Sequence, residues 1–212
     1  MAKRPVFLSL PVSPFVRVIE VDFEWNGGFA ASQQQKNIRA IHSAFERVCP
    51  GAPVLEISSK SLREEGVLLS AFNLQKYVPE LLESVPVECV FQGGKIFAFG
   101  GPYTDLYKKT SREAKRDPRL RESGVIRGFY FDGKEYPLFP KTAFYDWIYI
   151  NALMENDSLA KKLLNYVAFT DIAFNPAKSL NCQARAAAIF AGLSMSGSLD
   201  TVKSFDEFIK LY

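Results

Sequence analysis

The most informative part of the chain runs from Val87 to Phe97 and has the sequence VECVFQGGKIF. It is apolar enough for a protein core, yet it contains a carboxylate, an amide and an ammonium, at Glu88, Gln92 and Lys95. A helix turns by about 100° per residue, so Gln92 would lie about 40° to one side of Glu88 and Lys95 about 20° to the other. The spacing therefore predicts one helix on which the three polar side chains share a narrow face.

Two interpretations of this polar face remain open. In the first, it is a solvated stripe on an amphipathic helix, where Glu88 and Gln92 form an ordinary pair one turn apart. In the second, it is buried, because apolar side chains occupy nearly every other side of the helix. Gly93 and Gly94 are unfavourable inside a helix. They either admit the close approach of another group or end the helix early.

The composition indicates a globular domain. The chain has 212 residues, of which 48% are apolar and 14% aromatic, which is enough for one large core. It has no run of 18 apolar residues, and the N-terminal sequence MAKRPVFLSLPVSP is too short and too broken by proline for a signal peptide. We therefore expect a soluble, cytoplasmic protein that does not bind a membrane. Cys49, Cys89 and Cys182 are widely spaced and are expected to be reduced thiols.

Positive charge is concentrated in one segment. Between Lys108 and Arg127 the chain has eight Lys or Arg residues against three acids, a net charge of +5, while the whole chain carries only +3. Such a segment suits a partner that bears phosphates, either a nucleic acid or a nucleotide pyrophosphate. The alternative is the solvated face of a charged helix.

Hydrophobic periodicity predicts an α+β protein, predominantly helical, that forms a compact single domain with a few short strands. The alternation in VRVIEVDFEW predicts a strand, and Ser32 is the expected N-cap of the helix that follows. A hairpin is predicted around Asp132-Gly133, because both residues tolerate a positive φ. The predicted strands are 16–25, 54–57, 125–131 and 134–138, and the predicted helices are 32–48, 87–97, the basic segment up to Asp117-Pro118, 142–154, 158–167, 180–193 and one from Ser204.

Familiar catalytic signatures are absent, since the chain has no Walker loop, GxGxxG, GxSxG or HExxH motif. His42 is the only histidine, so we expect it to be structural rather than a metal ligand. Glu88 and Lys95 are the strongest chemical candidates. In a partly dry pocket a carboxylate can act as general acid or base and a lysine as nucleophile, although a plain ion pair remains the alternative.

VECVFQGGKIF resembles the E-x-x-x-Q-x-x-K-F signature of the NADAR family, and LSAFN, residues 69–73, stands where that family has a Phe-Ser-Asn-Phe motif. The combination of SQQQKNIRAIH, LEISSKS, GGPYTDLY, FYDW and TDIAFNPAKSLNCQAR is similar to the antitoxin branch that accompanies DarT-type DNA ADP-ribosyltransferase toxins. The resemblance to the wider family runs from about Leu69 to Arg185. It implies a single domain over 1–212, with a subfamily-specific strand and helix in 1–50, a catalytic core in 51–193 and a terminal helix in 194–212.

The resemblance implies an N-glycosyl hydrolase that removes ADP-ribose from guanine bases of DNA. The expected partners are ADP-ribosylated guanine in single-stranded DNA, ADP-ribose as product and a DarT-type toxin; no metal or cofactor is expected. Glu88 would be the catalytic acid and base, and Lys95 a second catalytic residue. The expected substrate-binding residues are Ser70, Asn73, Gln92, Gly101, Tyr103, Asp105, Lys115, Arg116, Trp147, Asp171, Asn181 and Arg185.

Other functions stay open at this point. Related family members suggest an N-glycosidase of small riboside metabolites. From a different class, the chain would be a module without catalytic activity that binds ADP-ribosylated nucleic acid or the toxin itself. The presence of both Glu88 and Lys95 favours an enzyme.

Overall fold

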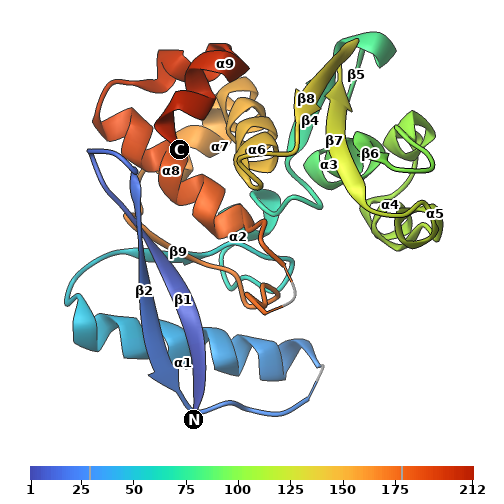
Figure 1. The fold of residues 1–212 in the computed structure, drawn as a ribbon. Helices are drawn as coiled ribbons and strands as arrows, with labels where there is room; N and C mark the ends of the chain where they lie inside the picture. The colour runs from blue at the N-terminus through green and yellow to red at the C-terminus, as the bar shows by residue number, and fades with distance from the viewer. Residues whose placement is uncertain (29, 178) are drawn as a thin grey trace.

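The N-terminal part of the chain forms a mixed sheet with a helix on each face. In this computed structural model, which describes residues 1–28, 30–177 and 179–212, the strand order is β2-β1-β9-β3. Strands β1 (Ala2–Ser9) and β2 (Val16–Phe23) are antiparallel, and β3 (Val54–Glu56) runs parallel to β9 (Ala168–Thr170). In Figure 1, helix α1 (Ala31–Val48) crosses behind the lower halves of β1 and β2, and α8 (Gln183–Met195) lies above β9.

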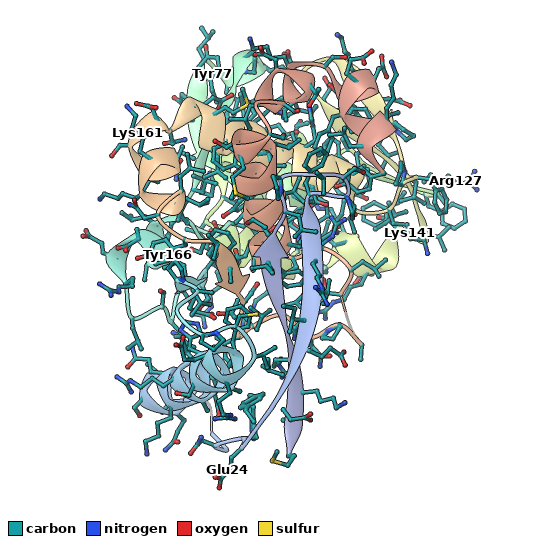
Figure 2. The ribbon with its side chains drawn as sticks, turned by 90° about the vertical axis from the view of Figure 1, so that its left-hand side faces the viewer. Glu24, Tyr77, Arg127, Lys141, Lys161 and Tyr166 are labelled. Atoms are coloured by element: carbon teal, nitrogen blue, oxygen red, sulfur yellow. The ribbon has the colours of Figure 1, made fainter. Side chains whose placement is uncertain are left out.

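Alternation along the strands explains this layering. On β1, Val6 packs in a small apolar cluster with α1, whereas its neighbour Phe7 belongs to the main core. Successive strand residues point to opposite faces, so each strand of the sheet serves both cores. Figure 2 shows the two long strands beside α1, with Glu24 at their lower end.

The remaining elements build the larger core around α6 (Ala143–Glu155) and α8. A second sheet, in the order β6-β7-β8, packs beside them, and β4 pairs with β5 as a separate hairpin. The other bounds are α2 (Glu64–Leu68), β4 (Gln75–Val78), β5 (Glu83–Pro86), α3 (Val87–Gly93), β6 (Lys95–Phe97), α4 (Ser111–Arg116), α5 (Arg119–Glu122), β7 (Ile126–Phe131), β8 (Lys134–Pro137), α7 (Asp157–Leu163) and α9 (Phe205–Phe208), with short 3₁₀ helices at Pro79–Leu81, Thr104–Lys108, Leu199–Lys203 and Ile209–Leu211.

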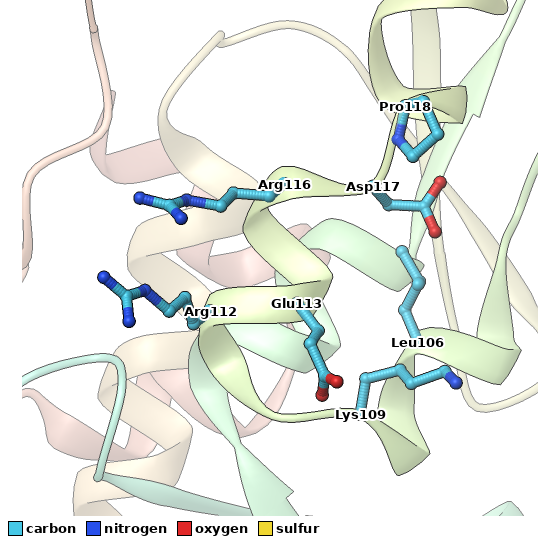
Figure 3. A pocket seen from close by; sticks show the side chains of 7 residues that line it. All are labelled: Leu106, Lys109, Arg112, Glu113, Arg116, Asp117 and Pro118. Atoms are coloured by element: carbon cyan, nitrogen blue, oxygen red, sulfur yellow. The ribbon is translucent and has the colours of Figure 1, made fainter.

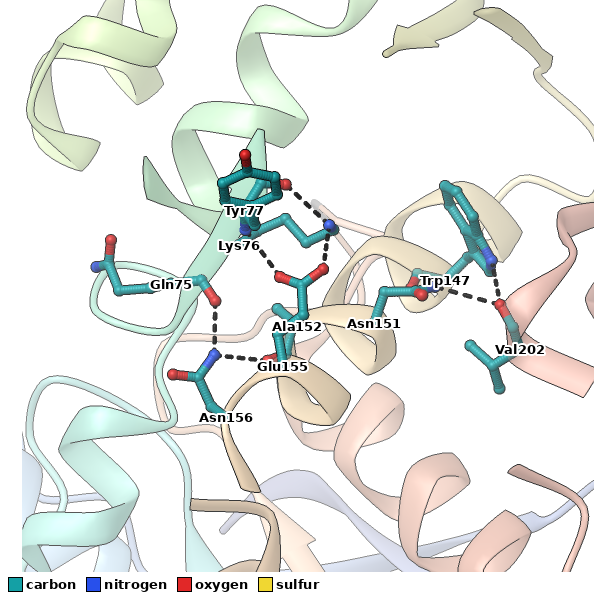
Figure 4. Close-up of polar contacts among 9 residues, drawn as sticks. All are labelled: Gln75, Lys76, Tyr77, Trp147, Asn151, Ala152, Glu155, Asn156 and Val202. Carbon is teal, nitrogen blue, oxygen red and sulfur yellow. Dashed lines mark hydrogen bonds and ion pairs between the residues drawn. The ribbon is translucent and has the colours of Figure 1, made fainter. Parts of the chain in front are cut away.

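An ion pair and hydrogen bonds connect the β4–β5 hairpin to the C-terminal end of α6 (Figure 4). Lys76 is 6% exposed, and its Nζ lies 2.5 Å from Glu155 Oε1. Asn156 Nδ2 donates to the carbonyl oxygen of Gln75 at 2.8 Å. A buried lysine is costly unless it is paired, so Glu155 allows Lys76 to remain in the core. Because α3 directly follows β5, these contacts also fix where α3 begins.

The predicted α+β class is confirmed. The hairpin at Asp132-Gly133 is also confirmed, with φ values of 49° and 73° that fit a type I′ turn. The basic helix ends before Pro118 as predicted, and a short helix follows it. The part of the chain that the structure describes contains no helix that is both long and apolar enough to cross a membrane.

Several local predictions were wrong. Ser32 is not the N-cap, because α1 starts at Ala31 and its capping residue Ala30 makes no side-chain cap bond. Strand β1 and the β4–β5 hairpin were not predicted, and the strand predicted at 16–25 ends at Phe23. The predicted helix over 87–97 ends at Gly93, after which 95–97 forms strand β6.

Candidate active site

Three polar side chains form a hydrogen-bonded line at the end of α3. Lys95 Nζ donates to Gln92 Oε1 at 2.5 Å, and Gln92 Nε2 donates to Glu88 Oε1 at 2.8 Å. Glu88 and Gln92 are 5% and 7% exposed, so the line lies inside the protein and is not a solvated stripe. The amide of Gln92 uses both of its ends, which fixes its orientation and couples the ammonium to the carboxylate.

Lys95 reaches this line from strand β6 instead of from the helix. It pairs with Phe129 of β7, and the amide of Tyr130 donates to the carbonyl oxygen of Gly94 at 2.6 Å. A Cβ atom on Gly94 would lie 2.4 Å from the carbonyl oxygen of Tyr130, so only glycine permits this contact. The helix therefore ends before Gly94, and strand β6 then places the Lys95 side chain on the same side as Glu88 and Gln92.

Gly93 also serves close packing within the protein. A Cβ atom there would lie 2.6 Å from the ring of Tyr107. The close approach that the sequence analysis expected at these glycines therefore occurs within the protein itself. Both glycines make room for other parts of this chain, namely the Tyr107 ring and the β7 backbone.

The surroundings of Lys95 favour its neutral form. Burial lowers the pKa of Lys95 to about 8; the carboxylate of Glu88 opposes this change, and the ammonium of Lys115 adds to it. Lys95 Nζ lies 4.6 Å from the centroid of the Phe91 ring, a cation–π contact that favours the ammonium and so opposes the effect of burial. With a pKa of about 8, about a tenth of this amine is unprotonated at pH 7, which is the form that a nucleophilic lysine requires.

Lys115 of α4 completes the charged group from the opposite side. Its Nζ lies 3.5 Å from Glu88 Oε1 and 5.2 Å from the centroid of the Phe72 ring, while the side chain remains 57% exposed. The Lys115 ammonium therefore lies beside the buried carboxylate of Glu88 and remains largely exposed to solvent. Its role in substrate binding stays a prediction.

Tyr145 of α6 is a candidate that the sequence analysis did not identify. It is 6% exposed, and its ring meets the Phe91 ring edge to face at a centroid distance of 5.0 Å. Burial raises the pKa of Tyr145, and Glu88 is the strongest of the charged groups that raise it further. The hydroxyl of Tyr145 therefore stays protonated over the physiological pH range. Tyr145 lies in the sequence FYDW, where an aromatic residue beside other aromatic residues is typical of a hydrophobic core. The sequence therefore contained no separate signal for a role of Tyr145 in the site.

The turn at residues 70–73 fixes the position of the first residues of α3 through hydrogen bonds. The amide of Glu88 donates to the carbonyl oxygen of Ala71 at 2.8 Å, and the amide of Ala71 donates to Gln183 Oε1 at 2.7 Å. Ser70 Oγ and Asn73 Nδ2 both donate to the carbonyl oxygen of Val67, which closes the turn. Ser70 is buried, whereas Asn73 is exposed. Gln183, another residue absent from the predicted set, therefore links α8 to the position of Glu88.

Asp171 and Asn181, from the C-terminal part of the chain, both carry buried polar groups. Burial raises the pKa of Asp171, the neighbouring Glu56 raises it further, and the charge of Lys115 lowers it. Asn181 Oδ1 is buried and has no hydrogen-bond partner among the described residues. An unsatisfied buried carbonyl is costly, so this oxygen is available to a ligand donor.

Tyr103 and Asp105 belong instead to a network on the protein surface. Arg119 Nη2 lies 2.7 Å from Asp105 Oδ2, and its guanidinium covers the Tyr103 ring at 4.4 Å. The Tyr103 hydroxyl bonds to Ser123. Gly101 precedes this network with a φ of 81°, and a Cβ atom there would lie 2.3 Å from the carbonyl oxygen of Lys95. Gly101 thus shapes the backbone around Lys95.

Trp147 and Arg185 lie in the packing of the C-terminal segment. Trp147 is 8% exposed, and its Nε1 donates to the carbonyl oxygen of Val202 at 2.8 Å (Figure 4). Arg185 pairs with the buried Asp146 and stacks on Tyr212. In this arrangement the indole is enclosed by protein, and its role in substrate binding stays a prediction.

Arg116, the last of the predicted residues, projects from α4 beside Arg112 (Figure 3). The structure thus brings Glu88, Gln92, Lys95 and Lys115 into one cluster. Asp171 lies close enough to Lys115 for that positive charge to lower the pKa of the Asp171 carboxyl. Within the described residues, no group of three or more His, Cys, Asp or Glu side chains is placed to hold a metal ion.

Comparison with known proteins identifies a family. A family model described as the DarT1-associated NADAR antitoxin matches residues 2–212, which is nearly the whole chain. No curated protein matches. The family model includes the segment from Glu88 to Lys95, which forms the buried polar line, and the N-terminal layer of β1, β2 and α1. The chain belongs to the family of DarT1-associated NADAR antitoxins.

Proposed function

We propose that this antitoxin hydrolyses the N-glycosidic bond between ADP-ribose and a guanine base of DNA that its toxin has modified. The observation that supports the proposal most strongly is the buried line Lys95–Gln92–Glu88, with Lys115 beside it. A carboxylate and a lysine of lowered pKa, held together in a dry site, are suited to cleaving a glycosidic bond. NADAR proteins are generally N-glycosidases, which agrees with this chemistry.

The first step is departure of the guanine. The bond joins C1″ of the ribose to the exocyclic amine of the base, so the leaving nitrogen must gain a proton as positive charge develops at C1″. Glu88 donates this proton as its carboxylic acid. The resulting carboxylate then removes a proton from water while the water oxygen bonds to C1″, which releases ADP-ribose and restores Glu88.

A second route uses Lys95 as the nucleophile. Its neutral amine attacks C1″ as the bond to guanine breaks, while Glu88 protonates the departing nitrogen. The ribose ring then opens as its oxygen takes a proton from the attached lysine nitrogen, and water hydrolyses the resulting protonated imine to ADP-ribose and the lysine ammonium, which returns a proton to Glu88. The pKa of about 8 supports this route, because it makes the amine available near neutral pH. Gln92 holds the amine on the same side as Glu88, so both routes use the same geometry.

The test compares two oligonucleotides, one ADP-ribosylated on guanine and one on thymine, and measures the release of ADP-ribose in a single turnover. We expect release from guanine and a loss of about 10² or more in Glu88→Gln with the fold retained. Glu20→Gln, which neutralises an exposed acid on β2, is the matched control. Rapid release by Glu88→Gln would remove Glu88 from the mechanism.

Two other outcomes would replace the proposal. Release from small ribosides but not from DNA would assign the site to metabolites. If the wild-type protein releases nothing and still suppresses its toxin, the chain acts by binding alone.

A further inference from the structure

The basic segment identified in the sequence divides into cations with different roles. Arg119 forms ion pairs with Asp105 and Asp117 and covers the Tyr103 ring, so its guanidinium is already engaged within the protein. Lys115 lies against Glu88 in the candidate active site. Their positive charge therefore cannot be counted as free surface charge.

Arg112 and Arg116 differ from both. They stand one turn apart on α4, both are exposed, and their guanidinium groups project side by side (Figure 3). Neither forms an ion pair or a side-chain hydrogen bond with any described residue. Both also line a pocket of about 430 Å³ that includes the acids Glu113 and Asp117, but their guanidinium groups project away from those carboxylates (Figure 3). Like charges at this spacing repel each other, so an anion between them would relieve the repulsion.

The position of this pair relates it to the active site. Arg116 follows Lys115 directly, and the 100° turn per residue places both arginines on the flank of α4 adjacent to the Lys115 side. Lys115 occupies the inner position above Glu88, whereas the arginines extend outward into solvent. A DNA strand whose modified guanine enters the site would continue outward along such a flank.

We propose that Arg112 and Arg116 bind a backbone phosphate of the DNA strand next to the modified guanine. This inference rests on the proposed function for the nature of the substrate. Each guanidinium presents a planar pair of N–H donors that matches the oxygens of a phosphodiester, and two adjacent ones form a clamp. The pyrophosphate of ADP-ribose has the same chemistry, so the experiment must distinguish these two sources of phosphate.

The first measurement is the binding of a fluorescein-labelled, unmodified single-stranded oligonucleotide at several salt concentrations. In the double variant Arg112→Ala/Arg116→Ala we expect the Kd to rise about tenfold near 0.1 M salt, and the slope of log Kd against log salt to fall by about 0.7 to 1.4. Arg39→Ala/Arg47→Ala is the control, because it removes the same charge from exposed positions on α1. Equal effects in the two double variants would overturn the proposal, since only overall charge would then matter.

The second measurement compares kcat/KM for an oligonucleotide that contains ADP-ribosyl-guanine with kcat/KM for the ADP-ribosylated nucleoside, which has no DNA phosphate. We expect the ratio of the two to fall about tenfold in the arginine variant. Equal losses on both substrates with unchanged DNA binding would assign the pair to the pyrophosphate instead. If the wild-type protein cleaves neither substrate, the proposed function fails, while the binding measurement still tests the arginine pair on its own.

Discussion

The role of Lys95 can be tested through the direction of its pH dependence. With a pKa of about 8, about 10% of the Lys95 amine is neutral at pH 7, against about 0.03% for a lysine at its usual value of 10.5. The structure therefore supplies an increase of roughly 300-fold in reactive amine. If this amine attacks C1″, the single-turnover rate should rise about tenfold per pH unit below pH 8 and level off above it.

The charges around Lys95 allow a second perturbation in the same assay. Lys115 lowers the pKa of Lys95, so Lys115→Met should raise that pKa and move the midpoint of the profile to higher pH. Lys60→Met, which removes an exposed lysine elsewhere, should leave the midpoint in place. The assay is the release of ADP-ribose between pH 6 and 9.5, followed in a single turnover so that product release does not interfere.

The opposite profile would refute the nucleophilic route. If the Lys95 ammonium acts by its charge, the rate should fall as the pH rises through 8, because the cation is then lost. Two further observations bear on the same point. Lys95→Arg keeps the charge but cannot form an imine, so full activity in this variant would exclude the covalent route. Borohydride added during turnover should leave ADP-ribose attached to Lys95 if the imine forms.

Three other residues give predictions of different kinds. Tyr145→Phe should slow cleavage about tenfold without unfolding the protein if its hydroxyl donates in the site, and a rate equal to that of wild type in single-turnover assays would place Tyr145 in the core alone. Trp147→Phe should lower the free energy of unfolding by about 1–3 kcal/mol in urea titrations, while a large rise in KM with unchanged stability would contradict the enclosed position of the indole. Burial lowers the pKa of His42 to about 4, below its usual 6.5, so the unfolded chain binds the extra proton between these values and stability falls as the pH is lowered. His42→Gln should remove about 2 kcal/mol of the change between pH 7 and pH 5, and an unaltered pH dependence of unfolding would disprove this contribution.

Elements with strong local signals were predictable from the sequence. The Asp132-Gly133 hairpin depends on the backbone freedom of two adjacent residues, and the end of α4 depends on Pro118, so neither needs tertiary information. Strand β1 lacks such a signal, because it contains Pro5 and faces a different apolar cluster on each side. It becomes a strand through its pairing with β2 and β9.

The candidate site was predictable in part for the same reason. Helical spacing placed Glu88 beside Gln92, and this pair is present. The roles within the basic segment were only partly predictable. Arg119 pairs with the nearby Asp117 but also with Asp105, and Lys115 pairs with Glu88, which lies far from it in the sequence. Net charge therefore identified the segment but not which of its cations remain free.

Lys95 lies near Glu88 as predicted, although the backbone between the two residues differs from the predicted one. A continuous helix would have placed Lys95 near Glu88, and so does a helix that ends at Gly94 and continues as a strand. Two backbone paths thus lead to the same juxtaposition, but they differ in rigidity. In the observed path Lys95 is held by the β6–β7 pairing and by the contact of Gly94 with the Tyr130 carbonyl, neither of which belongs to α3. The lysine and the carboxylate therefore rest on separate elements, with Gln92 hydrogen-bonded to both, and the distance between them depends on how closely β7 packs against the end of the helix.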